Sequence, residues 1–167
     1  MKKKEKKEKK EDSFEIIIET PKGSRNKYKY NEKKGTFILH KILPTGFSFP
    51  LDFGFIPDTK AGDGDPLDII LVSQQSTFPG CHIDCRIIGG IKAKQTENGK
   101  EVRNDRFFAV PVCDDTYSPI RDIKGLSKEL IDEITNFFIA YRKYENVEFV
   151  PLSLLTAEEA KKIIKSS

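Results

Sequence analysis

Three aspartates lie within the six-residue segment Asp63-Gly64-Asp65-Pro66-Leu67-Asp68, at the entrance to an apolar run. Ionised carboxylates at this spacing repel one another, so the cluster is readily tolerated when cations lie among the oxygens or water separates them. Hard divalent cations prefer oxygen ligands of this kind. The segment is therefore a candidate metal site.

An ordinary polar turn is the alternative, because Asp-Gly and Asp-Pro are common turn pairs. An EF-hand calcium loop is a poor alternative. Pro66 occupies the fourth position of such a loop, glycine is missing from the sixth, and Gln74 stands where the final glutamate ligand belongs. The residues of the segment alone leave the metal site and the polar turn both open.

Basic and aromatic residues alternate over residues 27–30. In an extended strand Lys27 and Lys29 fall on one face, and Tyr28 and Tyr30 fall on the other. The lysine face suits phosphate oxygens, whereas a solvated lysine face with the tyrosines packed inward is the alternative. Tyr141 occupies the apolar face of a helical pattern, so a core position is the alternative to a role in a site.

Short extended runs separated by turn residues occupy the chain from Phe14 to Val112, which predicts a small barrel or sandwich. The expected strands cover residues 14–19, 26–30, 36–42, 68–72, 83–94 and 103–112. After Gly125 the apolar residues recur at helical spacing, which predicts one long helix with Ser127 as its N-cap. Thr156 and Glu159 form a capping-box pattern, so a second, short helix is expected to close the chain.

The chain has 167 residues, of which 37% are apolar and 33% charged, so one compact core is expected. No apolar stretch approaches the roughly 20 residues that span a bilayer, and the N-terminus lacks the apolar segment of a secretory signal. The three cysteines have no paired short spacing, which suggests reduced thiols. We expect a soluble, cytoplasmic protein that has no membrane partner.

Residues 1–12 contain seven lysines and four acids, and we expect them to form a disordered tail ahead of one domain at residues 13–167. Without this tail, the 29 basic and 26 acidic residues of the chain become 22 of each. A nucleic-acid-binding protein usually has a basic face that neutralises many phosphates. The neutral body therefore argues against a nucleic-acid partner.

The acidic segment, with Ile69 behind it, resembles the signature of the family I inorganic pyrophosphatases. Further segments are similar to motifs of the same family, and their order and spacing over roughly residues 14–150 make the resemblance specific. These segments are Ile18-Glu19-Thr20-Pro21-Lys22-Gly23-Ser24, Lys27-Tyr28, Phe49-Pro50, Phe53-Gly54-Phe55, Ala109-Val110-Pro111, and Phe137-Phe138 with Tyr141.

The resemblance implies an α+β, mainly β fold, in which a twisted five-stranded OB-like barrel carries a long C-terminal helix and a second short helix outside. It implies Mg²⁺-dependent hydrolysis of inorganic pyrophosphate to two phosphates by a metal-activated water. Several ions per site are expected, with Mn²⁺ or another divalent ion as the alternative to Mg²⁺. The implied partners are pyrophosphate and further copies of the chain in a homo-oligomer. A catalytically impaired phosphate- or nucleotide-binding homologue on the same barrel is the alternative function.

The resemblance also implies roles for individual residues. Asp63, Asp65 and Asp68 correspond to metal-site aspartates, and Asp65 also to the acceptor of a proton from the attacking water. The implied catalytic set is Asp65, Glu19, Lys27 and Tyr141. The implied substrate-binding residues are Lys27, Lys29, Lys41, Arg106, Tyr141 and Arg142, and the further metal-ligand candidates are Glu97, Asn104 and Asp105.

Several of these positions depart from the usual pattern of the family. Lys29 stands where a glutamate is usual, Lys41 where an arginine is usual, and Phe53 where a tyrosine is usual, while Arg106 and Arg142 replace lysines. Positive charge is kept at three of these positions and inverted at one, and a hydroxyl group is lost at Phe53. Weaker metal binding or a changed metal preference is the expected consequence.

The segment from Gln95 to Arg106 also departs from the family, because it is longer than usual. If strand alternation holds, Asn104 and Arg106 share a face and Asp105 points away, so that a neutral amide replaces one metal ligand. A β-bulge would return Asp105 to the site.

Overall fold

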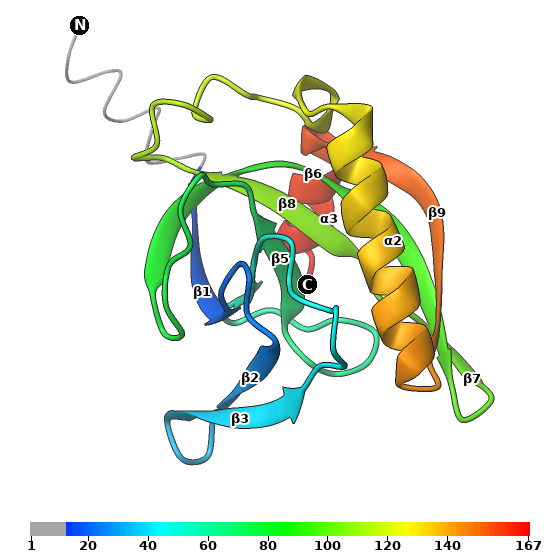
Figure 1. The fold of residues 1–167 in the computed structure, drawn as a ribbon. Coiled ribbons are helices and arrows are strands. Elements are labelled where there is room, and N and C mark those ends of the chain that lie inside the picture. Colours follow the sequence, from blue (N-terminus) through cyan, green and yellow to red (C-terminus); the bar gives the residue numbers. More distant parts are fainter. Residues whose placement is uncertain (1–12) are drawn as a thin grey trace, which may run out of the picture.

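The computed structural model describes residues 13–167, so the tail expected at residues 1–12 lies outside the described residues (Figure 1). Strands dominate the first part of the chain, and two α-helices follow them. The elements in chain order are β1 (Phe14–Thr20), β2 (Asn26–Asn31), β3 (Thr36–Ile42), β4 (Asp52–Ile56), β5 (Leu67–Leu71), β6 (His82–Glu97), β7 (Lys100–Arg103), β8 (Arg106–Pro111), η1 (Ile123–Gly125), α2 (Lys128–Tyr144), β9 (Glu148–Thr156) and α3 (Ala157–Lys165).

Five strands close into a ring in the order β1–β4–β5–β8–β6, and β6 pairs back with β1. The β5–β8 pair is parallel, whereas the other pairs of the ring are antiparallel. Strands β7 and β9 extend the sheet from β6, and β2 and β3 form a separate two-stranded sheet beside the ring (Figure 1). The expected OB-like, five-stranded, mainly β fold is confirmed.

Strand β6 is 16 residues long and takes part in four pairings, with β1, β7, β8 and β9. It turns from one pairing to the next at Gly89, where the register with β8 shifts and φ is +149°. A Cβ atom at this position would lie 2.5 Å from the carbonyl oxygen of Leu155. Glycine is therefore required where β6 passes from the ring to β9.

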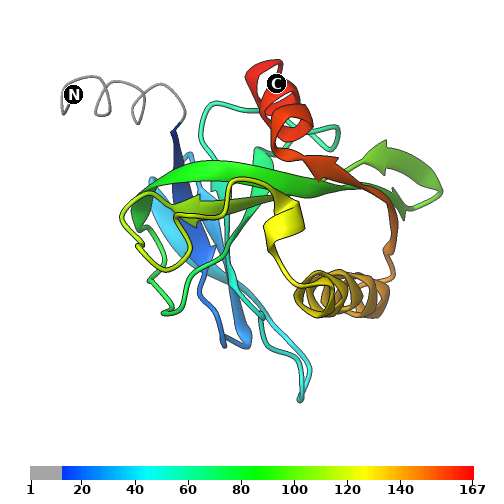
Figure 2. The same cartoon turned by 90° about the horizontal axis from the view of Figure 1, so that it is seen from above.

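The core is divided into two apolar clusters by the walls of the ring. One cluster takes residues from all five strands of the ring, such as Ile16, Leu67 and Phe107, together with Ala160 and Ile164 of α3. The other cluster packs the opposite faces of β5, β6 and β8 against α2. The two α-helices accordingly lie on opposite sides of β6 (Figure 2). Because β8 contributes to both clusters, all six of its residues are buried.

Both expected helices are confirmed, together with their N-terminal caps. The hydroxyl oxygen of Ser127 accepts a hydrogen bond from the Leu130 N–H at the start of α2. Thr156 and Glu159 form the expected capping box at the start of α3. Within residues 13–167, no helix is long and apolar enough to cross a membrane.

The strand pattern differs from expectation at three places. The strand expected over residues 103–112 begins only at Arg106, as β8, and Arg103 instead ends β7, because Asn104 and Asp105 turn toward β6 between the two strands. Strand β4 was not anticipated, since both of its faces are buried and alternation is absent. Strand β9 contains Pro151, which normally argues against a strand, but the register with β6 shifts next to this residue.

Closure of the ring depends on Gly54, where β4 lies closest to β1. A Cβ atom on Gly54 would lie 2.1 Å from the carbonyl oxygen of Ile17 and 2.9 Å from the Cα atom of Ile18. Both contacts are with backbone atoms, which cannot rotate away. We therefore expect Gly54→Ala to lower the free energy of unfolding by about 3 kcal/mol or more in chemical denaturation. Thr45→Ala, at an exposed position, should change it by less than about 0.5 kcal/mol, and equal losses in both variants would contradict this explanation.

Candidate functional site

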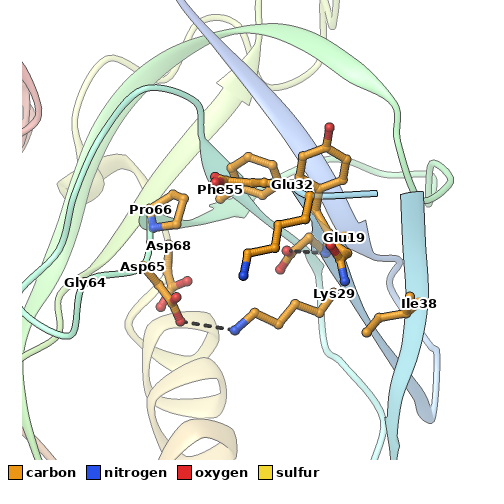
Figure 3. Close-up of a pocket in the computed structure, with 12 residues that line it drawn as sticks. Glu19, Lys29, Glu32, Ile38, Phe55, Gly64, Asp65, Pro66 and Asp68 are labelled. Carbon is orange, nitrogen blue, oxygen red and sulfur yellow. Dashed lines mark hydrogen bonds and ion pairs between the residues drawn. The ribbon is translucent and has the colours of Figure 1, made fainter. Parts of the chain in front are cut away.

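A polar pocket of about 220 Å³ lies between the ring, the β2–β3 sheet and the C-terminal end of α2. Every candidate residue singled out in the sequence lines this pocket except Asp105. A second pocket of about 470 Å³ adjoins it and shares four of its residues (Figure 3). The charged and polar candidates in the first pocket are Glu19, Lys27, Lys29, Lys41, Asp63, Asp65, Asp68, Glu97, Asn104, Arg106, Tyr141 and Arg142.

The acidic segment forms a turn that leads into β5. Gly64 has a φ of +88°, which this turn requires, and the Asp63 carboxylate accepts a hydrogen bond from the Asp65 N–H at 3.1 Å. Asp63 and Asp65 are exposed, whereas Asp68 is half-buried on β5. Burial raises the pKa of Asp68 above its ordinary value. The turn and the metal-site interpretations of the sequence are therefore compatible, because the turn presents all three carboxylates to one pocket.

Each of the three aspartates has a different partner in the pocket. Lys29 Nζ lies 3.2 Å from the Asp65 carboxylate. A dashed line in Figure 3 marks this ion pair. The Asn104 amide donates to Asp63 at 3.3 Å, and Arg106 forms an ion pair with Asp68 at 2.6 Å.

Among residues 13–167, no three His, Cys, Asp or Glu side chains are arranged to hold a metal ion as they stand. The carboxylate oxygens are nevertheless the donors that hard divalent ions prefer. Asp63 and Asp65 are exposed side chains that can rotate. The ammonium group that pairs with Asp65 belongs to the half-buried Lys29. The carboxylate oxygens of the three aspartates therefore fit a divalent ion once Lys29 releases Asp65 and Asn104 releases Asp63.

Glu19 and Lys27 face the pocket from β1 and β2, and burial shifts the pKa of both. Burial raises the pKa of Glu19 to about 7, although its carboxylate accepts a hydrogen bond from the Tyr30 N–H at 3.0 Å. Burial lowers the pKa of Lys27 to about 8. Near neutral pH, both groups are thus close to the point at which they exchange a proton.

The basic side of the pocket is built by β2, β3 and the last turn of α2. Lys27 and Lys41 are direct partners in the β2–β3 register. Lys27 Nζ donates to the Tyr141 hydroxyl at 2.6 Å. The Tyr141 ring packs on Phe137, with centroids 5.6 Å apart, and the residue is only 2% exposed. Tyr141 thus has both suggested roles, with its ring in the core and its hydroxyl group in the pocket.

The lysine face expected for β2 is also found. Both Lys27 and Lys29 line the pocket. On the same strand, Tyr30 stacks on Phe55 of β4, with centroids 5.8 Å apart and an interplanar angle of 19°. This contact packs β2 against the ring and leaves the lysines facing the acids.

Arg106 is buried in a cage of aromatic rings. Its guanidinium carbon lies 5.0 Å from the centroid of Phe138, 5.2 Å from that of Phe149 and 6.0 Å from that of Phe53. The Asn104 side-chain oxygen accepts from Arg106 Nη1 at 2.5 Å. The apolar ring at position 53 therefore packs against a cation, and the Arg106 side chain is only 4% exposed.

In the segment before Arg106, Asn104 and Arg106 face the pocket and Asp105 points away, as simple strand alternation predicts. Asp105 accepts a hydrogen bond from the Ala93 N–H at 3.0 Å and pairs with Arg103 at 2.9 Å, so it points away from the pocket. Glu97 ends β6 at the pocket, and the following Asn98-Gly99 turn has φ values of +51° and +76°. These values are typical of a tight hairpin turn, which contains part of the longer segment.

Glu145 is a residue of the site that the sequence analysis did not single out. It caps the C-terminus of α2, and its carboxylate accepts hydrogen bonds from Lys41, from Arg142 at 2.6 Å and from Tyr141 at 3.3 Å. Burial raises the pKa of Glu145, but the hydrogen bond from Lys41 and the nearby positive charges outweigh burial, and the pKa is lowered overall. The spacing of Tyr141, Arg142 and Glu145 on one helix end is the signal that could have identified it.

Comparisons with known proteins agree with this geometry. The family model described as inorganic pyrophosphatase matches residues 16–167. The inorganic pyrophosphatase of Halalkalibacterium halodurans is 35% identical over 151 residues, which are 90% of each chain. That of Synechocystis is 39% identical over 133 residues, which are 80% of this chain and 75% of the relative.

The crystal structure of an inorganic pyrophosphatase from Neisseria gonorrhoeae superimposes with a TM-score of 0.84 at 32% identity. The match covers 95% of this chain and 91% of that one. Sequence and fold thus agree over nearly the whole of the described chain, and the pocket contains the three aspartates of the acidic segment that resembles the family signature. The chain belongs to the inorganic pyrophosphatase family.

Proposed function

We propose that this protein hydrolyses inorganic pyrophosphate to two phosphates and uses Mg²⁺ to do so. The observation that carries the proposal is the convergence of the three aspartates of the acidic segment with five lysine and arginine side chains in one pocket. A highly anionic substrate needs cations around its oxygens, and a water nucleophile needs a proton acceptor. The pocket provides both kinds of group.

The basic side of the pocket is proposed to bind the substrate. Lys41 and Arg142 provide positive charge next to the Tyr141 hydroxyl group, and Lys27 lies within hydrogen-bond distance of that hydroxyl. Arg106, held by Asp68 and the aromatic cage, provides a fixed positive charge deeper in the pocket. These groups neutralise and orient the phosphate oxygens, so that the phosphorus atom faces the acids.

The acidic side is proposed to hold the metal ions. Asp63, Asp65 and Asp68 are the proposed ligands, and Glu97 adds a further carboxylate. Asn104 lies beside Asp63 and would supply a neutral oxygen only after its side-chain oxygen leaves Arg106. We leave Asp105 out of the set because it pairs with Arg103. A bound divalent ion supplies positive charge and lowers the pKa of a water molecule. Several Mg²⁺ ions are proposed, with Mn²⁺ as the alternative.

Asp65 is proposed to accept the proton of the attacking water. Its carboxylate is exposed and lies opposite the basic side of the pocket. In the present arrangement Lys29 holds this carboxylate, so Lys29 must move away before Asp65 accepts a proton. Glu19, with a pKa of about 7, is suited to exchange a proton within the same pocket.

The alternative of a catalytically impaired phosphate-binding homologue is not favoured. The proposed proton acceptor, the three-aspartate cluster, Glu19 and Lys27 are all present in one pocket. The lysine and arginine replacements keep cations on the substrate side, at Lys41, Arg106 and Arg142. The chemical requirements for hydrolysis are therefore met.

The remaining proposals concern the protein as a whole. We propose that residues 13–167 act as one domain in the cytoplasm, without a nucleic-acid partner, and that the protein forms a homo-oligomer. Exposed apolar side chains on two strands support self-association. They are Leu39 and Ile42 on β3, at 52% and 63% exposure, and Leu152 and Leu154 on β9, at 51% and 50%.

The first experiment measures phosphate released from pyrophosphate with and without Mg²⁺. We expect Asp65→Asn to keep the fold and to lower turnover by about 100-fold or more, because an amide cannot accept the proton of water. Asp132→Asn, an exposed change on α2, should retain parental turnover. Equal turnover in Asp65→Asn and the parent would remove the proposed role of Asp65.

Asn104→Asp tests which side of the segment faces the metal ions. We expect the variant to bind Mg²⁺ about tenfold more tightly in calorimetric titration, because it adds an anionic oxygen beside Asp63. Asn136→Asp, an exposed change on α2, should bind Mg²⁺ like the parent. Unchanged or weaker binding by Asn104→Asp would mean that position 104 does not face the ions.

Glu19 should make the metal-free protein less stable as the pH rises. Its pKa is about 7 in the folded protein against 4.5 ordinarily, so the folded state holds the proton more tightly than the unfolded chain. This contribution is fully present below pH 4.5 and is lost as the pH rises through 7. We expect denaturation in a chelator to show a fall of up to about 1.4 kcal/mol per pH unit in this window. The fall should be absent from Glu19→Gln. If the free energy of unfolding changes with pH in the same way in parent and variant, Glu19 does not cause the fall.

A further inference from the structure

The Glu145 carboxylate accepts hydrogen bonds from three of the groups that are proposed to bind phosphate, Lys41, Tyr141 and Arg142. We propose that Glu145 is a positioning residue that acts as an internal anion. It competes with phosphate for Lys41, Arg142 and Tyr141, and so weakens product binding and speeds product release. This inference rests on the proposed function, because it takes these three groups as part of the phosphate site.

The contacts of Glu145 place it among these groups rather than in solvent. Its side chain is 8% exposed, whereas Lys41 is 45% exposed and Arg142 is 14% exposed. Glu145 is fixed at the C-cap of α2, with its backbone N–H bonded to the carbonyl oxygens of Arg142 and Lys143. Lys41 reaches it from β3, far away in the sequence. The carboxylate is thus the more buried member of the pair, and the Lys41 side chain is the more exposed one.

Glu145 also uses the hydrogen-bond donors that a phosphate would need. A tyrosine hydroxyl has a single proton, and Tyr141 accepts from Lys27 and donates to Glu145. Arg142 directs Nη1 to Glu145 and Nη2 to Gln95, at 2.6 Å and 3.2 Å. Its Nε atom is buried and has no hydrogen-bond partner among residues 13–167. A phosphate that accepts a hydrogen bond from the Tyr141 hydroxyl must therefore take that proton away from Glu145, and it shares the Lys41 and Arg142 charges with the same carboxylate.

The charge of Glu145 has a second effect, because it repels any phosphate oxygen that approaches the same cations. Coulomb repulsion between anions that share partners in a half-buried pocket is screened much less than at a free surface. A carboxylate that only braced the lysine and arginine would strengthen phosphate binding by holding them in place. A competing carboxylate weakens it, so the sign of the effect distinguishes the two roles.

Titration of inorganic phosphate into the parent and into Glu145→Gln tests the proposal. We expect the variant to bind phosphate at least about tenfold more tightly, because its neutral amide no longer repels the anion. In the pyrophosphate assay, KM and kcat should both fall, since tighter product binding slows release. Glu145→Ser removes the same charge with a smaller side chain and gives an independent test if Glu145→Gln does not fold.

Two further variants serve as controls. Glu145→Asp retains the charge and should bind phosphate within about twofold of the parent, a change below 0.5 kcal/mol. Glu133→Gln removes a negative charge from an exposed position of α2, twelve residues or about 18 Å along the helix, and should leave phosphate affinity unchanged.

The outcomes separate this inference from the proposed function. Unchanged or weaker phosphate binding by Glu145→Gln and Glu145→Ser, with an active parent, overturns the role of Glu145 and leaves the pyrophosphatase proposal intact. A parent that binds phosphate but hydrolyses no pyrophosphate overturns the proposed activity, while the titration still decides the role of Glu145. A parent that binds no phosphate overturns both.

Discussion

The ion pair between Asp68 on β5 and Arg106 on β8 connects the barrel to its pocket. The two residues are direct partners in the parallel β5–β8 register, so the pairing that closes this part of the ring also places a carboxylate against a guanidinium group. A buried charge is costly unless it is paired and hydrogen-bonded. Arg106 meets that condition at Nη1 through Asp68 and Asn104, whereas its Nε atom has no hydrogen-bond partner among residues 13–167, and aromatic rings surround the guanidinium group. The remaining site residues are arranged around this pair.

The pocket is balanced in charge, and this balance links its acids to its bases. Lys29 holds Asp65, Arg106 holds Asp68, and Glu145 holds Lys41 and Arg142. Under the proposed function, substrate and metal ions exchange partners with these internal pairs, so that binding is a competition between internal and external charges. Such a competition would favour release over very tight binding.

Local signals in the chain determined a large part of the fold. Ser127, Thr156 and Glu159 marked the starts of both helices correctly, because N-caps use side-chain atoms that are close in sequence. Most strands followed from short apolar runs between turn residues. Strands β4 and β9 did not, because burial on both faces removes alternation from β4 and because β9 contains a proline.

The sequence by itself also determined which residue types could form the site. The crowded aspartates and the resemblance around them selected every carboxylate, lysine, arginine and amide residue that lines the pocket, but not Glu145, which binds three of the lining residues. Only the tertiary structure decided how these residues pair. It turned Asp105 toward Arg103, placed Asn104 and Arg106 in the pocket, and brought Glu145 against Lys41 across 104 positions of the chain. The physical reason is that strand register and helix docking set these contacts, and both are fixed by long-range packing that no local pattern encodes.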